Sequence, residues 1–107
     1  MKKQARFTIL RHSQCVEKRN HYDIVIERCL GTNSEEVALA KYESLRIRQV
    51  TKAIYDSDVR RRYLTYEGPM GENKGVISQI DSGSYETLPN GNLLLVGKKL
   101  RLELKIR

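Results

Sequence analysis

Several residue types that define other classes of protein are scarce in this chain. Tryptophan is absent, and the sequence has 2 cysteines, 2 histidines, 2 prolines and 1 phenylalanine. No apolar run approaches the roughly 20 residues that a membrane span needs, and no apolar segment follows the basic start at Met1, which argues against a signal peptide. Cys15 and Cys29 lack the spacing of a metal site. We therefore expect reduced thiols in a cytoplasmic protein that does not contact membranes.

Length and composition predict one soluble globular domain spanning residues 1–107. Hydrophobic residues make up 39% of the chain and charged residues 31%, which argues against disorder. The formal net charge is +7, and basic residues cluster at Arg60, Arg61 and Arg62 and again after residue 97. A basic surface attracts phosphate backbones, although such a cluster can also be no more than a solvated face.

Alternating hydrophobicity predicts several β-strands. In residues 21–27, Tyr22, Ile24 and Ile26 fall on one face, which we expect to lie inward. His21 and Asp23 then point together off the outside of the sheet. The clearest strand is predicted at residues 100–107, where apolar and charged residues alternate strictly. Further candidates are residues 6–11, 75–81, 84–88 and 93–96.

Two segments have the composition of turns, and the secondary structure of the middle of the chain is ambiguous. Residues 81–84 and 89–92 have the composition of turns, and the second would join two strands into a hairpin. Residues 32–35 resemble a capping box, so residues 35–48 could be helical, although residues 37–41 could equally be a strand.

Residues 55–63 are predicted to be irregular or a short helical turn. Many short strands separated by turns favour a mostly β fold. We expect a small, closed or partly open antiparallel β-barrel with one or two short helices.

Both histidines lie close to an aspartate in the sequence. His12, His21 and Asp23 bring two imidazoles and a carboxylate together near the N-terminus. Imidazole is suited to metal ligation and to phosphate chemistry near neutral pH. These residues are the first candidates for a functional site.

Four segments, in order, resemble the 3′-phosphoesterase domain of bacterial and archaeal DNA ligase D. In residues 6–27 a strand ends in a basic residue and His12, and a His-Tyr-Asp strand follows. Residues 63–69 are similar to the family's Tyr-x-Asp-Phe/Tyr-Glu-Gly segment, residues 75–86 to its Gly-x-Val-x-x-Trp-Asp-x-Gly segment, and residues 97–100 to its Gly-x-Lys-Leu segment. The chain is similar to a shortened, stand-alone member.

The resemblance implies a compact β-barrel with its active site on the outer surface. Known members use manganese to trim 3′-terminal ribonucleotides and 3′-phosphates, which leaves a 3′-hydroxyl. The expected partners are therefore DNA or RNA–DNA 3′ ends, with a DNA ligase or polymerase as a candidate protein partner.

By position, the resemblance implies a role for each of five residues. His12 and Asp23 match metal ligands, for which an imidazole and a hard carboxylate suit manganese. His21 matches a histidine that acts on the phosphate as a charged donor or general acid. Lys41 matches a lysine that holds phosphate, and Tyr63 matches a tyrosine near it.

Three positions depart from the family pattern. The third metal-binding histidine is replaced by Val59, and a phosphate-anchoring arginine by Val25. A further arginine falls near Thr51, with Lys52 beside it as an imperfect substitute. Asp58 as a replacement ligand remains an open alternative, as does phosphate binding by the arginine triplet at residues 60–62.

We therefore expect a ligase D-type DNA end-processing domain with impaired catalysis. One alternative is a non-catalytic module that binds nucleic-acid ends or phosphate. The other is a small basic β-barrel that binds a protein partner.

Overall fold

A computed structural model describes residues 5–16, 19–29, 37–59, 65–71 and 73–106. Eight strands lie in this part of the chain, and no described residue is helical. No helix of these residues is therefore long and apolar enough to cross a membrane. The strands are β1 (Ala5–Cys15), β2 (His21–Cys29), β3 (Val37–Ser44), β4 (Val50–Val59), β5 (Gly68–Pro69), β6 (Lys74–Thr87), β7 (Leu93–Gly97) and β8 (Arg101–Ile106).

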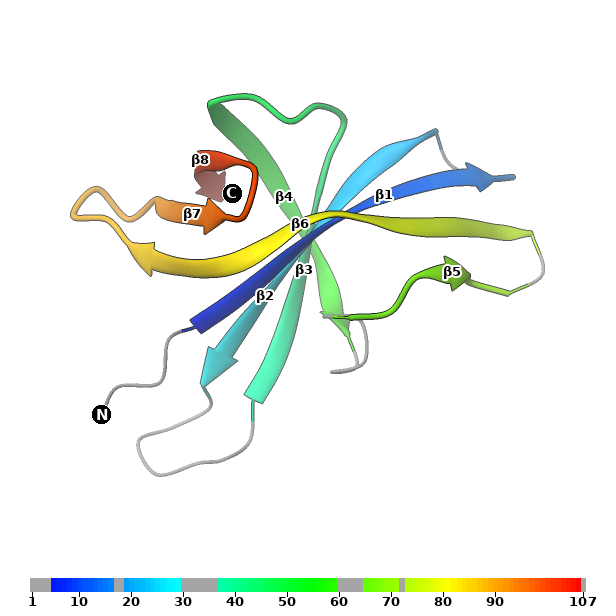
Figure 1. Ribbon diagram of the computed structural model, residues 1–107, viewed down its shortest axis with the longest axis horizontal. Coiled ribbons are helices and arrows are strands. Elements are labelled where there is room, and N and C mark those ends of the chain that lie inside the picture. The colour runs from blue at the N-terminus through cyan, green and yellow to red at the C-terminus, as the bar shows by residue number, and fades with distance from the viewer. Residues whose placement is uncertain (1–4, 17–18, 30–36, 60–64, 72, 107) are drawn as a thin grey trace.

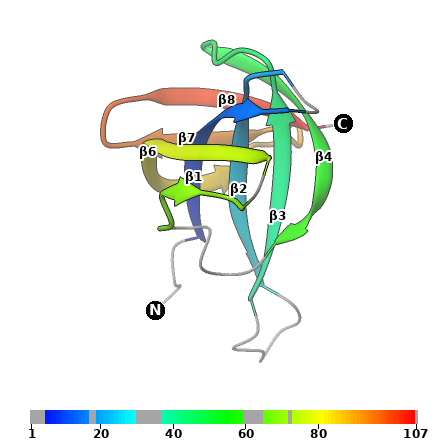
Figure 2. The ribbon, with the colours of Figure 1, turned by 90° about the vertical axis from the view of Figure 1, so that its right-hand side faces the viewer.

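Seven of the strands close into a barrel. The sheet runs in the order β1-β2-β3-β4-β8-β7-β6-β5, and β1 also pairs with β6, which closes the ring and leaves β5 as an extra strand (Figures 1 and 2). The mostly β barrel expected from the sequence is confirmed. The ring is mixed rather than wholly antiparallel, because Val50–Ala53 of β4 run parallel to Glu103–Ile106 of β8.

The middle of the chain forms a strand and not a helix. Of the segment 35–48, residues 37–44 form β3, as the strand alternative for 37–41 predicted. Ala40 and Tyr42 alternate with polar neighbours and enter the core, and this period of two fits a strand. The capping-box residues 32–35 lie outside the described residues.

Two other local predictions were wrong. Residues 55–59 belong to β4, whereas 60–63 lie outside the described part of the chain. The predicted turn at 81–84 lies inside β6. The register between β1 and β6 shifts at Ile9/Leu10, opposite the start of this segment. The turn-like segment therefore begins next to a register shift, at which Ile80 has no partner residue in β1.

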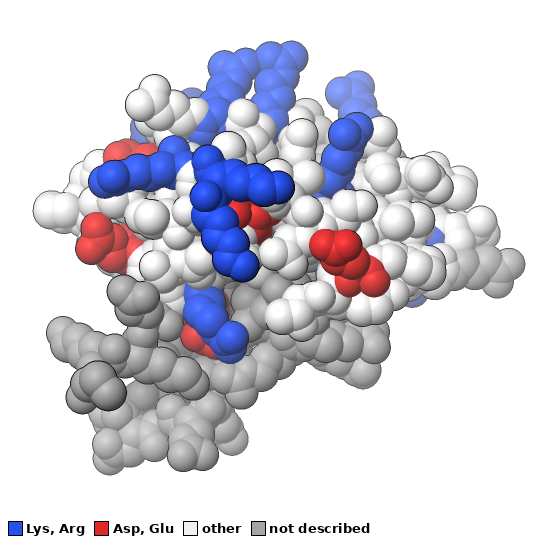
Figure 3. Space-filling model, viewed as in Figure 1, with Lys and Arg blue, Asp and Glu red and all other residues white. Residues whose placement is uncertain are grey.

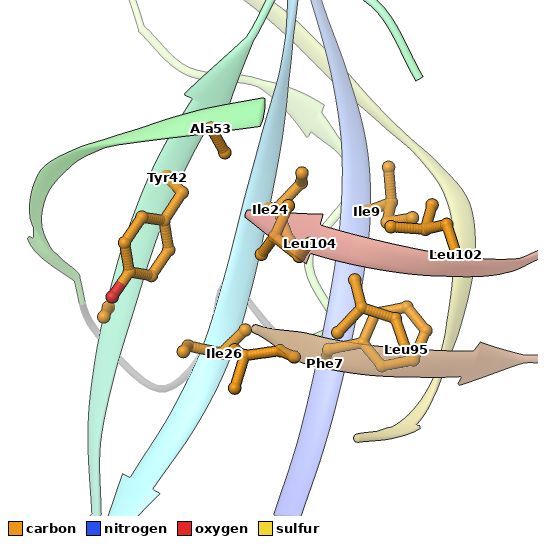
Figure 4. Close-up of a cluster of buried hydrophobic side chains, with 11 residues drawn as sticks. Phe7, Ile9, Ile24, Ile26, Tyr42, Ala53, Leu95, Leu102 and Leu104 are labelled. Atoms are coloured by element: carbon orange, nitrogen blue, oxygen red, sulfur yellow. The ribbon is translucent and has the colours of Figure 1, made fainter. Parts of the chain in front are cut away.

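The core fills the barrel interior. Eleven buried side chains from six strands meet there, and Figure 4 shows how they converge. The face of β2 predicted to lie inward does so, because Ile24 and Ile26 are buried in this cluster and Tyr22 packs against it. The other members are Phe7, Ile9, Ala40, Tyr42, Ala53, Leu93, Leu95, Leu102 and Leu104.

A second apolar cluster lies on the opposite face of β1 and β2. Its buried members are Leu10, Val25 and Ile77. Residues 7–10 are therefore buried on both faces of β1, which explains why the alternation in segment 6–11 was irregular. A strand covered on both faces has no polar side to reveal its period.

A buried carboxylate ties β6 to the connection between β7 and β8. Asp81 accepts hydrogen bonds from the backbone N–H groups of Ser82, Lys98, Lys99 and Leu100, at 2.7–3.0 Å. Burial by itself would raise the pKa of Asp81, but these four donors stabilise the charged form and hold its pKa below the ordinary value. The ionised side chain is thus a structural anchor of this end of the barrel.

Two glycines allow this close packing. A Cβ on Gly97 would lie 2.1 Å from Oδ2 of Asp81, and one on Gly83 would lie 2.1 Å from the carbonyl oxygen of Val96. No side chain fits at either position without moving backbone or the Asp81 carboxylate. The Asp-x-Gly and Gly-x-Lys-Leu segments therefore meet in space as parts of one anchor.

Candidate metal centre

The two histidines and the aspartate lie together on the outer face of β1 and β2. His12 is directly opposite His21 in the strand pairing, and Asp23 follows on the same face of β2. Although this face lies outside the barrel, the exposed fractions of His12, His21 and Asp23 are only 8%, 5% and 3%. One nitrogen or oxygen atom from each lies within 4.8 Å of the others. The predicted clustering of His21 and Asp23 is confirmed.

Backbone carbonyl groups fix the orientation of both imidazole rings. Nε2 of His12 donates to the carbonyl oxygen of Lys74 at 2.6 Å, and Nδ1 of His21 donates to that of Arg19 at 2.8 Å. In a neutral ring the other nitrogen then carries a lone pair. Each of these lone pairs faces Asp23: Nδ1 of His12 lies 3.2 Å from Oδ2, and Nε2 of His21 lies 3.0 Å from Oδ1.

This arrangement brings acceptor atoms against one another. Neither Nε2 of His21 nor Oδ1 of Asp23 makes a hydrogen bond of acceptable geometry to the described residues, and both atoms are buried. A lone pair and a carboxylate oxygen repel each other, so each contact needs a second proton on the ring or a cation between the atoms. Buried polar atoms left without a partner are costly, which favours a ligand here.

The donor atoms fit a divalent transition metal. Histidines that ligate metals usually donate their other ring N–H to a carbonyl or carboxylate, as both rings do here. Two donors about 2.1 Å from a tetrahedral metal lie about 3.4 Å apart, close to the observed separations. Imidazole and carboxylate ligands suit manganese, iron and zinc. His12, His21 and Asp23 could therefore hold such an ion.

An apolar cavity beside Asp23 is lined by Val25 and Val59, the two valines singled out in the sequence. Val25 and Val59 pack with Leu10 and Ile77 in the outer cluster. These four residues, together with Asp23, Lys41 and Met70, line a cavity of about 110 Å³. In this cavity neither valine can ligate a metal or bind an anion.

Lys41 lies beside this cavity but is engaged elsewhere. Its Nζ forms an ion pair with Oδ2 of Asp56 at 3.0 Å. The side chain points off the outer face, opposite Val25 on the neighbouring strand. The structure thus places Lys41 next to the candidate site, already neutralised by a carboxylate.

A larger cavity of about 850 Å³ opens on the other side of the site. His21 and Glu43 form one wall, and Lys52 lies in the same cavity. Thr51, near which the resemblance led us to expect an arginine, is buried and hydrogen-bonded to the backbone of Arg48. Lys52 is exposed and is the better placed of the two to meet an anion.

Sequence reasoning missed four charged residues at this larger cavity. They are Glu43, Arg46, Arg48 and Asp56. Glu43 could have been found by extending the strand alternative for 37–41, because it shares a face with Lys41 two residues earlier. Arg46 and Arg48 lie in the connection between β3 and β4, for which the sequence gives no periodic signal.

Several predicted site residues lie outside the described part of the chain. These are Tyr63 and the triplet Arg60, Arg61 and Arg62. Asp58 lies in β4, but its side chain is also outside what the structure describes. The structure therefore brings together His12, His21 and Asp23, with Lys41 and Lys52 at neighbouring cavities.

Comparisons with models of known protein families give no match for this chain. No curated protein matches it. No solved structure matches it either. The chemistry of the site, together with the residues of the four segments, is what supports a function.

Proposed function

We propose that this protein is a metal-binding domain for nucleic-acid 3′ ends, related to the 3′-phosphoesterase of DNA ligase D, with weakened or lost catalysis. The observation that carries the proposal is the convergence of one ring nitrogen of His12 and one of His21 on the buried carboxylate of Asp23. A bound manganese ion would polarise a phosphoryl oxygen and stabilise the charge that develops on it.

The residues around the metal ligands support weakened hydrolysis. A phosphate needs positioned cationic donors as well as a metal, and guanidinium groups provide the best bidentate geometry. The position of the family's arginine is occupied by fully buried Val25, and Lys41 is paired with Asp56. His12, His21 and Asp23 would therefore bind the metal with little help in orienting a phosphate.

The larger cavity supports binding of a nucleic-acid chain. Three exposed cations line it: Arg46, Arg48 and Lys52. Four of the six exposed large hydrophobic residues of the described part of the chain line it too, and these are Leu45, Val50, Ile54 and Tyr55. Cations with apolar side chains suit phosphates and bases of a single strand. Lys and Arg also gather along the edge of the molecule at the β3–β4 connection (Figure 3).

The direct test is release of a 3′-phosphate or a 3′-terminal ribonucleotide from a primer–template, with and without manganese. We expect slow, metal-dependent release by the wild-type protein and none by His12→Ala. In Val59→His the new imidazole enters the smaller cavity beside Asp23. It should raise manganese affinity by about 10-fold or more, because changes to the residues around a metal typically alter its affinity by about 10- to 100-fold.

Two results would contradict this proposal. Release that is unaffected by His12→Ala would place the chemistry elsewhere. A manganese titration of Val59→His identical to that of wild type would show that position 59 does not face the metal.

Binding of single-stranded DNA should depend on the cations of the larger cavity. Replacing Arg46 and Arg48 with glutamine should weaken binding and reduce the slope of log K against log salt by about 1.4, for two lost phosphate contacts to a single strand. Fluorescence anisotropy over a salt series measures this slope. The matched control is the double replacement of exposed Lys98 and Lys99.

The control pair removes the same charge at exposed positions that do not line the cavity. If both double variants lower the slope equally, binding is spread over the basic surface. If wild-type protein shows no salt-dependent binding, the protein-partner alternative is favoured.

A further inference from the structure

We propose that Glu43 is the fourth donor of the metal site and takes the place of the family's missing histidine. This inference rests on the metal site of the proposed function. It assigns to the site a residue of β3 that faces the larger cavity. The resulting donor set is two imidazoles and two carboxylates.

Strand pairing sets Glu43 against the site. Glu43 lies directly opposite Asp23 across the β2–β3 pair, on the same outer face. Two carboxylates in that position repel each other unless a positive charge lies between them. Nε2 of His21 is the atom between them, 3.0 Å from Oδ1 of Asp23 and 3.6 Å from Oε1 of Glu43.

The ring of His21 cannot satisfy both carboxylates as a neutral group. Its Nδ1 hydrogen is donated to the carbonyl oxygen of Arg19, so the neutral ring presents a lone pair to both acids. Asp23 is 3% exposed, so little water reaches its carboxylate to screen the repulsion. A divalent cation among these atoms converts each repulsion into a bond.

Three separations between neighbouring donors are close to those within a coordination shell. Glu43 reaches the group of His12, His21 and Asp23 through His21, and its carboxylate must turn toward the ion to join that group. The three contacts of 3.0, 3.2 and 3.6 Å link His12, Asp23, His21 and Glu43 in one chain of donors. They bracket the spacing of about 3.4 Å between tetrahedral ligands of a zinc-sized ion. On the opposite side, Val59 offers no donor.

The donor set also predicts metal preference. Imidazole and carboxylate ligands accept several divalent ions, and affinity rises from manganese through cobalt to zinc for a given set of ligands. We therefore expect the order Mn²⁺, Co²⁺, Zn²⁺ in increasing affinity. Co²⁺ is the useful probe, because its visible spectrum reports the number of ligands.

The test is titration of the metal-free protein with Co²⁺ alone, followed by its visible spectrum, and with Mn²⁺ by electron paramagnetic resonance. Glu43→Gln should weaken binding by about 10- to 100-fold and alter the Co²⁺ spectrum. Glu86→Gln removes the same charge from an exposed position in β6 and should bind as wild type. Unchanged affinity and spectrum in Glu43→Gln would overturn the assignment.

A second measurement guards against simple misfolding. In the presence of a chelator, Glu43→Gln should unfold at the same temperature as wild type or higher, because it removes a carboxylate facing Asp23. A lower unfolding temperature would mean that Glu43 is a structural partner of His21 and not a donor. Loss of binding in both Glu43→Gln and His12→Ala supports the assignment.

The same series separates this inference from the function on which it rests. If His12→Ala abolishes Co²⁺ binding and Glu43→Gln does not change it, the metal site stands without Glu43. If neither variant changes binding, the metal site itself is refuted.

Discussion

Replacing Asp81 with asparagine is expected to lower the free energy of unfolding at neutral pH by about 3 kcal/mol, the upper range for hydrogen bonds to a charged group. The asparagine amide keeps one oxygen that can accept hydrogen bonds. Its NH₂ group replaces the other carboxylate oxygen and faces backbone N–H groups that donate to that oxygen in the wild-type protein. Gly97 leaves no space for the side chain to move. For a chain of this length the unfolding temperature should fall by about 12 °C.

The effect of Asp81 should also depend on pH. Its pKa is held below the ordinary value in the folded protein, so its stabilising contribution is present above the pKa of the unfolded chain. The contribution is lost as the pH falls through the lower, folded pKa. Chemical denaturation from pH 7 into acid, through and below the ordinary range of an aspartate carboxyl group, measures it.

The stability difference between wild type and Asp81→Asn should therefore shrink in acid. Glu86→Gln, at an exposed position on the same strand, serves as the control and should change stability little. A difference between wild type and Asp81→Asn that stays constant over the pH range would show that the charge of Asp81 contributes nothing.

The second large effect concerns metal-linked stability through Asp23. At a metal concentration 100-fold above the dissociation constant, wild-type protein should gain about 2.7 kcal/mol. This gain corresponds to an increase of about 10 °C in unfolding temperature. Asp23→Asn should lose the gain, because an amide is a poor metal ligand and the two imidazoles lose their shared partner.

Without metal the same variant should unfold no earlier than wild type. The amide NH₂ can donate to Nε2 of His21, which has no hydrogen bond to the described residues. Thermal unfolding with a chelator and with excess Mn²⁺ measures both effects. Asp56→Asn, which removes an exposed carboxylate paired with Lys41, is the control and should keep the metal response. An equal response to Mn²⁺ in Asp23→Asn would refute the site.

Local alternation was enough to predict the face on which the site lies. In β2 the strict period of two separates Ile24 and Ile26 from His21 and Asp23, and no long-range information is needed. The hairpin between β6 and β7 was also predictable from local sequence, because residues 89–92 form its turn.

The rest depended on contacts between distant segments. The segment that begins at Asp81 was mistaken for a turn, because the Asp81 side chain bonds to the backbone of Lys99, which lies far along the sequence. The parallel pairing of β4 with β8 leaves no local trace either. Glu43 was overlooked because its role depends on lying opposite Asp23, which the register of β3 determines.

The order of the strands also has a kinetic consequence. His12, His21, Asp23 and Glu43 all belong to the meander β1-β2-β3, whose pairings join neighbouring parts of the chain. The two pairings that close the ring, β1–β6 and β4–β8, join segments far apart in sequence and carry the greater entropic cost of loop closure. Because such non-local pairings set the speed of folding, we expect ring closure to be the slow step. Closure of the β1–β6 pair also brings the carbonyl group of Lys74 to the ring of His12, so the site is complete only after it.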